Sequence, residues 1–545
     1  MTAAMADESL QRSPRFIGAL FVLLVIFLSL GLSHREFHGE EGRRAMAARE
    51  TIASGDFLVP TVSGIPYLNK PPLYPWLTAV VASICGEVDA VSVRIPAMFA
   101  TTLTAMALLC AGFRLAAPRV GVLAAFLFLL CPMVMRKSTL GETDLLLTLG
   151  CSLYALEMLV IWTTPKLSVS RASMVSMILG LCIAFLSKGT AALPFVAGVL
   201  MAASWMAKPG SWKRPTWWAP PLLSAALSSL WAIAVLQRPE ALSVYEGWLN
   251  EMTRVGSSPK WWQHRWEYIS GVLLGFFPAT LVLLMIRQSE EKKRFFSDSI
   301  FRFLAVAVLV PAICYLLWPG VQPRYLLPAV PLICLLMARC VDLQAFAHQE
   351  LQPVSDRVME TMTRFLQGLL VTVAFVALVI AISRSFDPQI WPKIPTATSG
   401  SWIAIAAILL VGALIPTRSV TGGFPGPSWT RLLLLLAAWL MVHSLVLLPI
   451  RGQQRPGERI AHGIEEAVPE DCSLWHDVSA NWNTLAQVDR DLIQISTERQ
   501  PSAGDWVLIR NPGPGELVTV LAVIELQDGS RRTLGVLSSG SVEEK

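Results

Sequence analysis

The chain has 545 residues, of which 54% are apolar, 15% are charged and 19 are Trp, and its mean hydropathy is clearly positive. A soluble protein carries about 25% charged residues, so this composition excludes an ordinary cytosolic enzyme. The net charge of +5 gives no case for a nucleic-acid partner, because Lys and Arg in a membrane protein mainly report its topology.

Apolar runs, taken in chain order, predict about thirteen membrane spans. The first run, 16–33, has no small-residue cleavage site after it and is interpreted as a retained span rather than a signal peptide. The other spans are expected near residues 92–113, 119–135, 143–162, 172–187, 191–207, 217–236, 269–286, 302–318, 325–341, 365–383, 402–416 and 431–450. The predicted fold class is therefore a polytopic α-helical membrane protein whose two termini lie on opposite sides.

The distribution of Lys and Arg orients the chain. With the N-terminus inside, the inner loops carry roughly one basic residue in five and the outer loops roughly one in eight. A few cations on the outer side nevertheless lie in short polar segments against the membrane. Because this placement opposes the topological preference of Lys and Arg, it indicates a functional role. These cations are Arg43, Lys70, Lys188 and Arg324.

The composition changes at about residue 451. The tail 451–545 has 9 Lys and Arg against 15 Asp and Glu, a charge content that is normal for soluble protein. A helix is predicted at 456–468. Four strands, separated by Gly, Pro and Asp turns, are predicted at 472–478, 491–496, 505–510 and 517–526. The sequence thus predicts a transmembrane domain over 1–450 and a small α/β domain over 451–545 on the outer side.

The loop after the first span, 34–91, is the most informative stretch. Its segment 40–54 is predicted to be a helix that stops at Gly55. A second segment, 72–85, is expected to be a helix that lies along the membrane interface.

Two interpretations are open for the acidic pair Glu40 and Glu41. Acidic residues favour the first turn of a helix because they complement its dipole, and this interpretation is preferred for Glu41. Glu40 follows a span at membrane level, where a carboxylate is costly unless it is used or paired, so a functional role is preferred. Arg43 and Arg44 lie on the same helix face as Glu40. Arg43 is either the ion-pair partner of Glu40 or a bidentate hydrogen-bond donor to a phosphate.

The motifs of this loop resemble those of polyprenyl-phosphate-sugar glycosyltransferases of the GT-C class. They are Glu40-Glu41-Gly42-Arg43, then SGDFLVP, then GIPYLNKPPLYPWL. The pattern is most similar to bacterial transferases that put aminoarabinose on lipid A, and more distantly to protein O-mannosyltransferases. Two positions depart from it: the first acidic residue is commonly Asp, and the residue before Lys70 is often acidic but here is Asn69.

Metal binding is not expected. Asn69 weakens any site that would use a carboxylate there. His34 and His38 have a spacing that can suit a metal on a helix, but they precede the predicted helix. The nine cysteines show no CxxC spacing, so neither a zinc ribbon nor a disulfide framework is implied.

The other candidate residues lie in later outer segments. The resemblance makes Asp144 the second carboxylate of the site, although a helix cap by Thr143 or Asp144 is also open. Lys188 either snorkels to the surface or binds phosphate. Arg324 either anchors the interface or, with Tyr325, lies near the lipid carrier as the resemblance implies.

The loop 238–268 is rich in Trp and Tyr. Trp261 and Trp262 are expected to anchor the membrane interface, with a gate over the site as the alternative, and His264 has no assigned role. The predicted catalytic residues are Glu40 and Asp144, and the predicted substrate-binding residues are Arg43, Tyr67, Lys70, Lys188, Arg324 and Tyr325.

These candidates converge on one membrane face, which suits a substrate with a phosphate leaving group and a lipid tail. We expect sugar transfer from a polyprenyl phosphate to a lipid, glycan or protein acceptor at the outer, periplasmic face of a bacterial inner membrane. Lys70, Arg43 and Arg324 would hold the phosphate without a divalent metal.

The carboxylates would act on the acceptor. If it is a hydroxyl, Glu40 or Asp144 could accept its proton, with inversion at the anomeric carbon, whereas a phosphate acceptor needs no base. A protein O-mannosyltransferase-type enzyme is the alternative within enzymes. A transporter or flippase is disfavoured, because such proteins place ionisable groups near the midplane of repeated halves.

Overall fold

The computed structural model describes two groups of residues. The first is 35–163, 169–206, 215–238, 261–281, 295–318, 321–345, 354–386 and 402–408. The second, near the C-terminus, is 456–469, 471–477, 482–488, 491–495, 499–509, 517–525 and 531–537. Single positions between 18 and 33, at 283 and 293, and between 435 and 442 complete the set.

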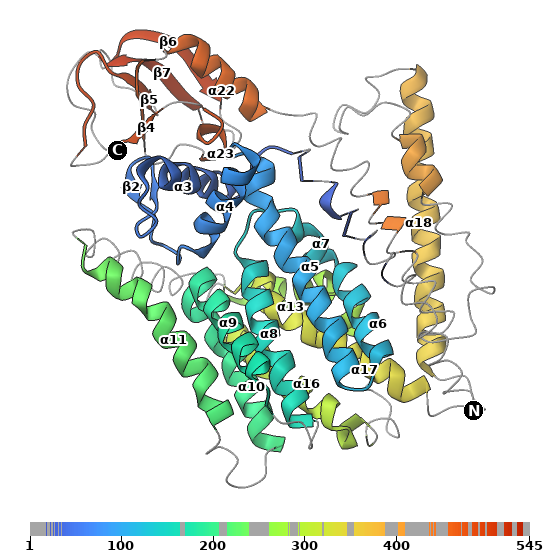
Figure 1. Ribbon diagram of the computed structural model, residues 1–545. Helices are drawn as coiled ribbons and strands as arrows, with labels where there is room; N and C mark the ends of the chain where they lie inside the picture. The colour runs from blue at the N-terminus through green and yellow to red at the C-terminus, as the bar shows by residue number, and fades with distance from the viewer. Residues whose placement is uncertain are drawn as a thin grey trace.

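A bundle of apolar helices forms the larger part of the molecule (Figure 1). Among the described residues, six helical stretches are long and apolar enough to cross a membrane, or seven if the bent pair α6 and α7 counts as one span. The six are α5 (Ala90–Arg114), α8 (Asp144–Thr163), α9 to α10 (Arg171–Met206), α11 (Pro215–Leu236), α16 (Ser299–Leu317), and η4 with α17 (Pro323–Ala345). The predicted total of thirteen stays a prediction, since 16–33, 402–416 and 431–450 lie largely outside the described residues.

Two predicted spans differ in shape from the prediction. The run expected at 119–135 is divided into α6 (Pro118–Leu129) and α7 (Pro132–Ser138), which meet at 64°. The run expected at 269–286 is α13 (Trp261–Gly275) followed by the short turn η3 (Ala279–Leu281). A proline stands at each interruption, Pro132 and Pro278, and proline cannot donate the backbone hydrogen bond that would continue a helix.

The stretch Arg171–Met206 is divided by the 3-10 turn η1 (Gly189–Ala192) into α9 (Arg171–Lys188) and α10 (Leu193–Met206). Both parts contact α8, but α9 packs mainly against α8 and α11, whereas α10 packs mainly against α16. Helices α8 and α9 approach very closely, because a Cβ atom on Gly150 would lie 2.3 Å from the Gly180 carbonyl oxygen. Small residues permit such backbone contact between membrane helices.

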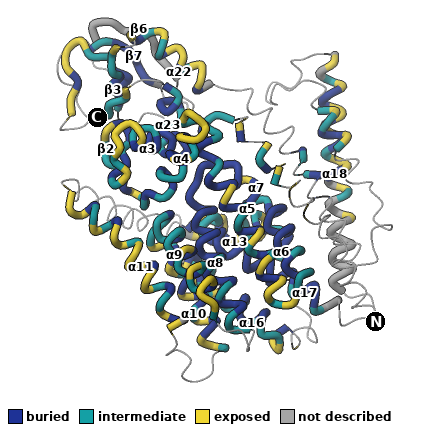
Figure 2. The backbone as a smooth tube through the Cα atoms, viewed as in Figure 1, coloured by how far each residue is buried: buried dark blue, intermediate teal, exposed yellow. Residues whose placement is uncertain are grey.

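The centre of the bundle is formed by α8 and by η4 with α17. In their most apolar windows, 78% of the residues of α8 and 89% of those of η4 and α17 are buried (Figure 2). By contrast, α11 carries exposed Leu and Ile side chains on its outer face, as expected for a helix that faces lipid. The long helix α18 (Val354–Phe386) stands at the edge of the bundle (Figure 1).

The first outer loop folds into α3 (Glu41–Ser54), a hairpin of β1 (Thr61–Val62) and β2 (Ile65–Pro66), and α4 (Leu73–Cys85). As predicted, α3 ends at Gly55, which has the left-handed φ of 71° that glycine adopts at little cost. The hydroxyl of Tyr74 in α4 donates to the carbonyl of Val93 at 2.8 Å. This contact fixes α4 against the start of α5.

The C-terminal residues form a five-stranded sheet of order β4-β3-β5-β7-β6 above α3 (Figure 1). Its strands are β3 (Leu474–His476), β4 (Leu492–Gln494), β5 (Trp506–Ile509), β6 (Leu517–Glu525) and β7 (Arg531–Leu537). Strand β3 pairs in parallel with β4 and β5, and β7 pairs antiparallel with β5 and β6.

Helix α22 (Pro456–Ala467) precedes this sheet, as predicted, and the short helix α23 (Trp482–Leu485) follows β3. The sequence interpretation missed β7 and α23. That 451–545 is a separate outer domain stays a prediction.

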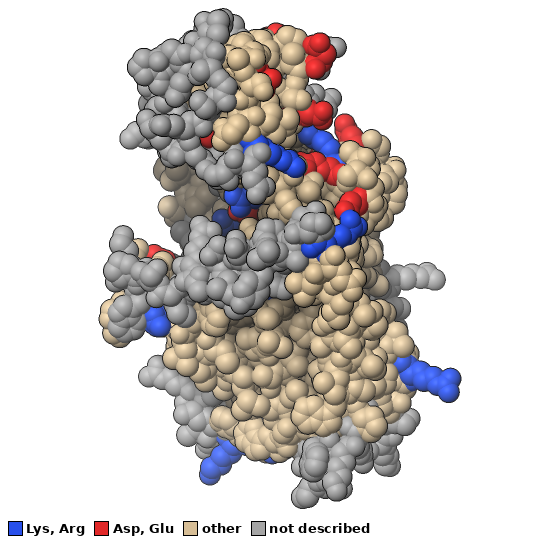
Figure 3. Space-filling model, turned by 90° about the vertical axis from the view of Figure 1, so that its left-hand side faces the viewer, with Lys and Arg blue, Asp and Glu red and all other residues tan. Residues whose placement is uncertain are grey.

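The charges are unevenly distributed. Figure 3 shows coloured side chains gathered over the upper part of the molecule, above a broad belt almost free of charge on that face. A few cations lie at the opposite end (Figure 3). Such a belt is the surface that a hydrocarbon layer requires.

Candidate functional site

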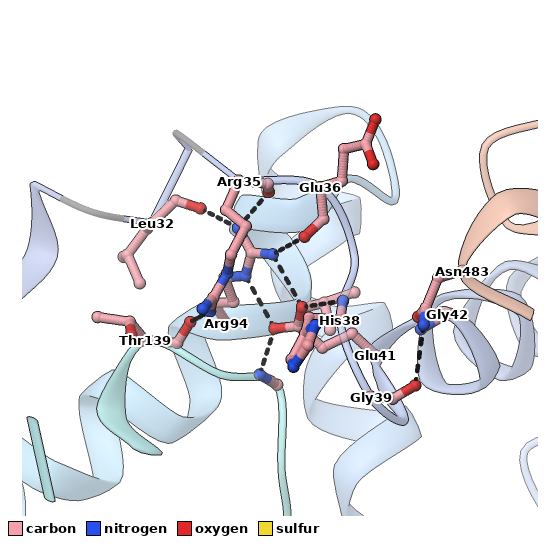
Figure 4. Close-up of polar contacts among 12 residues, drawn as sticks. Leu32, Arg35, Glu36, His38, Gly39, Glu41, Gly42, Arg94, Thr139 and Asn483 are labelled. Carbon is pink, nitrogen blue, oxygen red and sulfur yellow. Dashed lines mark hydrogen bonds and ion pairs between the residues drawn. The ribbon is translucent and has the colours of Figure 1, made fainter. Parts of the chain in front are cut away.

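A buried ion pair fixes the start of α3. Both carboxylate oxygens of Glu41 accept hydrogen bonds from Arg94 at 2.8 Å, and both side chains are fully buried (Figure 4). Glu41 also accepts from the backbone N–H groups of Gly141 at 2.6 Å and His38 at 2.8 Å. Burial raises the pKa of the Glu41 carboxyl, but the hydrogen bonds and charge of Arg94, the charge of Arg35 and the bond from Gly141 together outweigh burial and leave that pKa below its ordinary value.

Glu41 is therefore a structural residue, as the sequence favoured, but the cause is a buried ion pair rather than the helix dipole alone. Arg94 completes the pair by donating to the carbonyls of Leu32, Arg35 and Glu36 at 2.5–2.8 Å (Figure 4). The sequence analysis missed Arg94. The signal was a lone charge near the start of an apolar span, which requires a partner.

A second cluster joins three segments of the chain at the mouth of the bundle. The carboxylate of Asp144 lies 2.5 Å from Lys188 Nζ and 3.8 Å from Lys137 Nζ. Lys137 also pairs with Glu142, whose carboxylate lies 3.5 Å from an Arg324 guanidinium nitrogen. The structure thus brings together the predicted residues Asp144, Lys188 and Arg324, and adds Lys137 and Glu142.

Aromatic rings line one side of this cluster. The Lys188 ammonium lies 5.1 Å from the ring centroid of Tyr325, and the Arg324 guanidinium carbon lies 6.0 Å from it. Tyr325 packs at 5.7 Å against the ring of Tyr315, whose hydroxyl donates to the Ala191 carbonyl at 2.9 Å. Tyr325 therefore supports the two cations by cation–π contact.

Arg324 keeps an unused donor. Its Nε is buried, and within the described part of the chain it has no hydrogen-bond partner. Buried polar atoms are almost always satisfied, so this N–H is suited to a ligand that carries acceptor oxygens.

Lys70 adds a partly buried cation next to this cluster. Burial, with the charges of Arg44 and Lys188 nearby, lowers the pKa of Lys70 to about 8, although Asp144 and Glu40 partly offset this effect. No described residue forms an ion pair with its ammonium. A desolvated cation between other cations is stabilised by a bound anion.

Arg44 is a further cation that the sequence analysis did not assign to the site. It is 3% exposed, donates to the Gly141 carbonyl, and lies 5.2 Å from the ring centroid of Tyr74. Its neighbour Arg43 turns another way, with a nitrogen 3.2 Å from the Glu40 carboxylate. The ion-pair alternative left open for Arg43 is therefore the contact that the structure contains.

The remaining candidates lie apart from this cluster or outside the described residues. Tyr67 is partly buried against the apolar contacts between α3 and the C-terminal strands, and its role in substrate binding stays a prediction. Trp262 on α13 is 69% exposed, and His264 lies 3.8 Å from Glu267. His34 and residues 239–260 of the aromatic loop lie outside the described residues.

Among the described residues, no group of three or more His, Cys, Asp or Glu side chains is placed to hold a metal ion. The charged groups nevertheless form an asymmetric set. Three carboxylates, Glu40, Glu142 and Asp144, face five cations besides Arg43, which are Arg44, Lys70, Lys137, Lys188 and Arg324. This excess of positive charge suits an anionic ligand with several acceptor oxygens.

Comparison with known proteins gives three findings. The family model "Dolichyl-phosphate-mannose-protein mannosyltransferase" matches residues 69–236. The undecaprenyl phosphate-alpha-4-amino-4-deoxy-L-arabinose arabinosyl transferase of Enterobacter sp. (strain 638) is 28% identical over 334 residues, which cover 58% of this chain and 58% of that relative. The arabinosyl transferase 2 of Proteus mirabilis (strain HI4320) carries the same name and is 24% identical over 548 residues. That match covers 92% of this chain and 95% of the Proteus protein.

The solved structures add the fold. The crystal structure of ArnT from Cupriavidus metallidurans bound to undecaprenyl phosphate superposes with a TM-score of 0.74 at 16% identity, covering 97% of this chain and 100% of that one. The resemblance that the first outer loop predicted is confirmed, in sequence and in fold. The chain thus spans somewhat more than half the length of the first of these relatives, at 28% identity, and nearly the whole of the solved structure.

Proposed function

We propose that this protein transfers a sugar from a polyprenyl phosphate to a lipid acceptor at the outer face of a bacterial inner membrane. The observation that carries the proposal is the set of five cations around three carboxylates, with Lys70 unpaired among the described residues. The names of the relatives favour 4-amino-4-deoxy-L-arabinose as the sugar. The family model favours protein as a second acceptor class.

The phosphate of the donor would bind Lys70 and Arg324. Lys70 carries an ammonium with no competing ion pair in the described residues, and Arg324 carries the unused Nε donor. Negative charge develops on the phosphate as the glycosidic bond breaks, and fixed cations stabilise that charge most in the transition state. The leaving group is then the polyprenyl phosphate itself.

The two predicted catalytic carboxylates would have different roles. Asp144 is held by Lys188 at 2.5 Å and by Lys137 at 3.8 Å, which favours its ionised form and suits it to orient ligands. Glu40 forms an ion pair with Arg43, and its side chain is 39% exposed. Glu40 is therefore the better placed to accept a proton from an acceptor hydroxyl.

The experiment that tests the function uses the purified full chain in proteoliposomes. Undecaprenyl phosphate-linked 4-amino-4-deoxy-L-arabinose and lipid A are supplied with and without EDTA, and the lipids are analysed by mass spectrometry. We expect modified lipid A in both samples. Donor movement across the bilayer without any product would instead indicate a flippase, and modification of added protein but not lipid would favour the second acceptor class.

The carboxylate roles give a first prediction. Glu40→Gln removes the proposed base and should lower kcat about 10²–10⁴-fold, with a smaller effect on the KM for the donor. Asp144→Asn should raise that KM as well as lower kcat, because Lys188 loses the partner that holds it. Steady-state kinetics of both variants check the difference, and full activity of Glu40→Gln would remove the base from the mechanism.

The pKa of Lys70 gives a second prediction. The sugar-linked phosphate is a diester that stays singly charged in this range, and the Lys70→Arg control below separates titration of Lys70 from titration of the amino group on the sugar. Lys70 is protonated below about pH 8 and loses its charge above it. The KM for the donor should therefore rise about tenfold per pH unit above this value.

The control for that pH dependence is Lys70→Arg. An arginine stays protonated throughout this range, so the rise in KM above about pH 8 should disappear in the variant. A rise that persists in Lys70→Arg would assign the titration to another group.

A further inference from the structure

The first turn of α3 is held from outside the membrane bundle by helix α23. The backbone N–H of Gly42 donates to Asn483 Oδ1 at 3.0 Å, and Asn483 Nδ2 donates to the Gly39 carbonyl at 3.1 Å (Figure 4). These two bonds stand on either side of Glu40 in the sequence. A Cβ atom on Gly42 would lie 2.4 Å from the Trp482 carbonyl oxygen, so glycine is required for the helices to approach this closely.

Trp482 contacts Arg43, which pairs with Glu40. The guanidinium carbon of Arg43 lies 5.3 Å from the Trp482 ring centroid, and a nitrogen of the same group lies 3.2 Å from the Glu40 carboxylate. An arginine can stack on an aromatic face while its N–H groups point to a carboxylate. Ring, guanidinium and carboxylate thus form a continuous series of contacts.

The Trp482 ring is itself fixed. It meets the ring of His476 edge-on, with centroids 5.4 Å apart and an angle of 89°. His476 is fully buried, and its two ring nitrogens lie 2.9 Å from Ser63 Oγ and from the Asp477 carbonyl oxygen. Burial lowers the pKa of His476 to about 4, so the imidazole is neutral and these bonds persist at the pH of an assay.

The hairpin that holds His476 is tied to α3 as well. The carboxylate of Glu50 accepts hydrogen bonds from the backbone N–H groups of Ser63 and Gly64 at 2.5 and 3.0 Å. In addition, Arg49 donates to the Ala486 carbonyl at 3.0 Å, just beyond α23. The position of Trp482 relative to α3 is therefore determined at several points.

We propose that Trp482 is a positioning residue of the active site, which holds the Arg43 guanidinium so that Arg43 orients the Glu40 carboxylate. The inference rests on the function proposed above, in which Glu40 accepts the acceptor proton. It assigns Arg43 to the carboxylate rather than to the phosphate. It also makes helix α23, in the C-terminal part of the chain, a support of the active site.

The test compares two replacements of the ring in the proteoliposome assay. Trp482→Phe keeps an aromatic face and should leave kcat within about twofold of wild type. Trp482→Leu keeps apolar bulk but loses the π face, and kcat should fall about five- to tenfold while the KM for the donor stays within about twofold. A rise in donor KM at unchanged kcat would overturn the inference, since it would place Arg43 on the phosphate.

The matched control is Trp475→Leu. Trp475 lies in the same strand as His476 but packs against a different cluster, with Ile495, Val507 and Leu537. This variant should lose a similar amount of thermal stability and keep its kcat. An equal loss of kcat in Trp475→Leu would show that the effect of Trp482 is general destabilisation.

A double variant decides whether Trp482 acts through Arg43. Contacts in series are not additive, so Trp482→Leu should cause no further loss of kcat when it is added to Arg43→Ala. The same five- to tenfold loss in that background would overturn the inference. Failure of the proposed function is recognised separately, because wild-type protein would then make no product, and the role of Trp482 would fall with it.

Discussion

Replacement of Lys70 by Met should lower the rate of sugar transfer about 10²–10³-fold. This is the loss seen when one fixed donor to a developing negative charge is removed. The variant should not be less stable than wild type. The fold lowers the pKa of Lys70, which means that the folded protein disfavours the charged form, so removal of the charge at pH 7 relieves a cost.

The measurement pairs kinetics with thermal unfolding in detergent. Lys70→Arg is the control, since it keeps the positive charge and should retain part of the activity. Activity and stability should move in opposite directions in Lys70→Met. Wild-type turnover of Lys70→Met would remove the phosphate role of this residue, whereas a large fall in its melting temperature would contradict the burial argument.

Replacement of Glu41 by Gln should destabilise the folded protein, whereas replacement of Lys70 by Met should lower its activity without lowering its stability. The variant leaves the Arg94 guanidinium buried without a charged partner, and breaking a buried pair in this way costs about 3–5 kcal/mol. The expected result is a large fall in melting temperature and in the yield of folded protein. Tryptophan fluorescence during heating reports the change.

The neighbouring carboxylate provides the control. The ion pair of Glu40 with Arg43 is partly exposed, with 39% and 34% of the side chains accessible, and such pairs contribute about 0–1 kcal/mol. Glu40→Gln should therefore unfold near the wild-type temperature although its activity is lost. Equal melting temperatures for the Glu40 and Glu41 variants would contradict the division of roles between the two residues.

Much of the membrane fold follows from the sequence, because a run of apolar residues has few alternatives in a bilayer. The starts and ends of α5, α8 and α16 lie within a few residues of the predictions. Helix α3 and its end at Gly55 were also predictable, since a left-handed glycine is a local signal. The bend between α6 and α7 could have been predicted from Pro132.

The site was only partly predictable. Asp144, Lys188 and Arg324 could be named one by one, because each is a charge beside an apolar run. Their mutual contacts could not, since they depend on the packing of segments that are 44 or more residues apart. Lys137 lies in the same polar segment as Asp144, but the sequence alone did not distinguish it from its neighbour Arg136.

The contact of α23 with α3 had no sequence signal at all. Helix α23 has only four residues, and the spacing of Trp482 and Asn483 carries no recognisable pattern. Strand β7 was missed for a related reason, because its two arginines break the apolar alternation expected of a strand.

The bond between Gly42 and Asn483 joins residues 441 positions apart, and this separation has a consequence for biosynthesis. A ribosome makes α3 early and α23 near the end, so the contact can form only after almost the whole chain has been inserted. A chain released before that point contains every proposed donor ligand but lacks the support for Glu40. Such a chain would bind the lipid-linked sugar but transfer it several-fold more slowly than the complete protein.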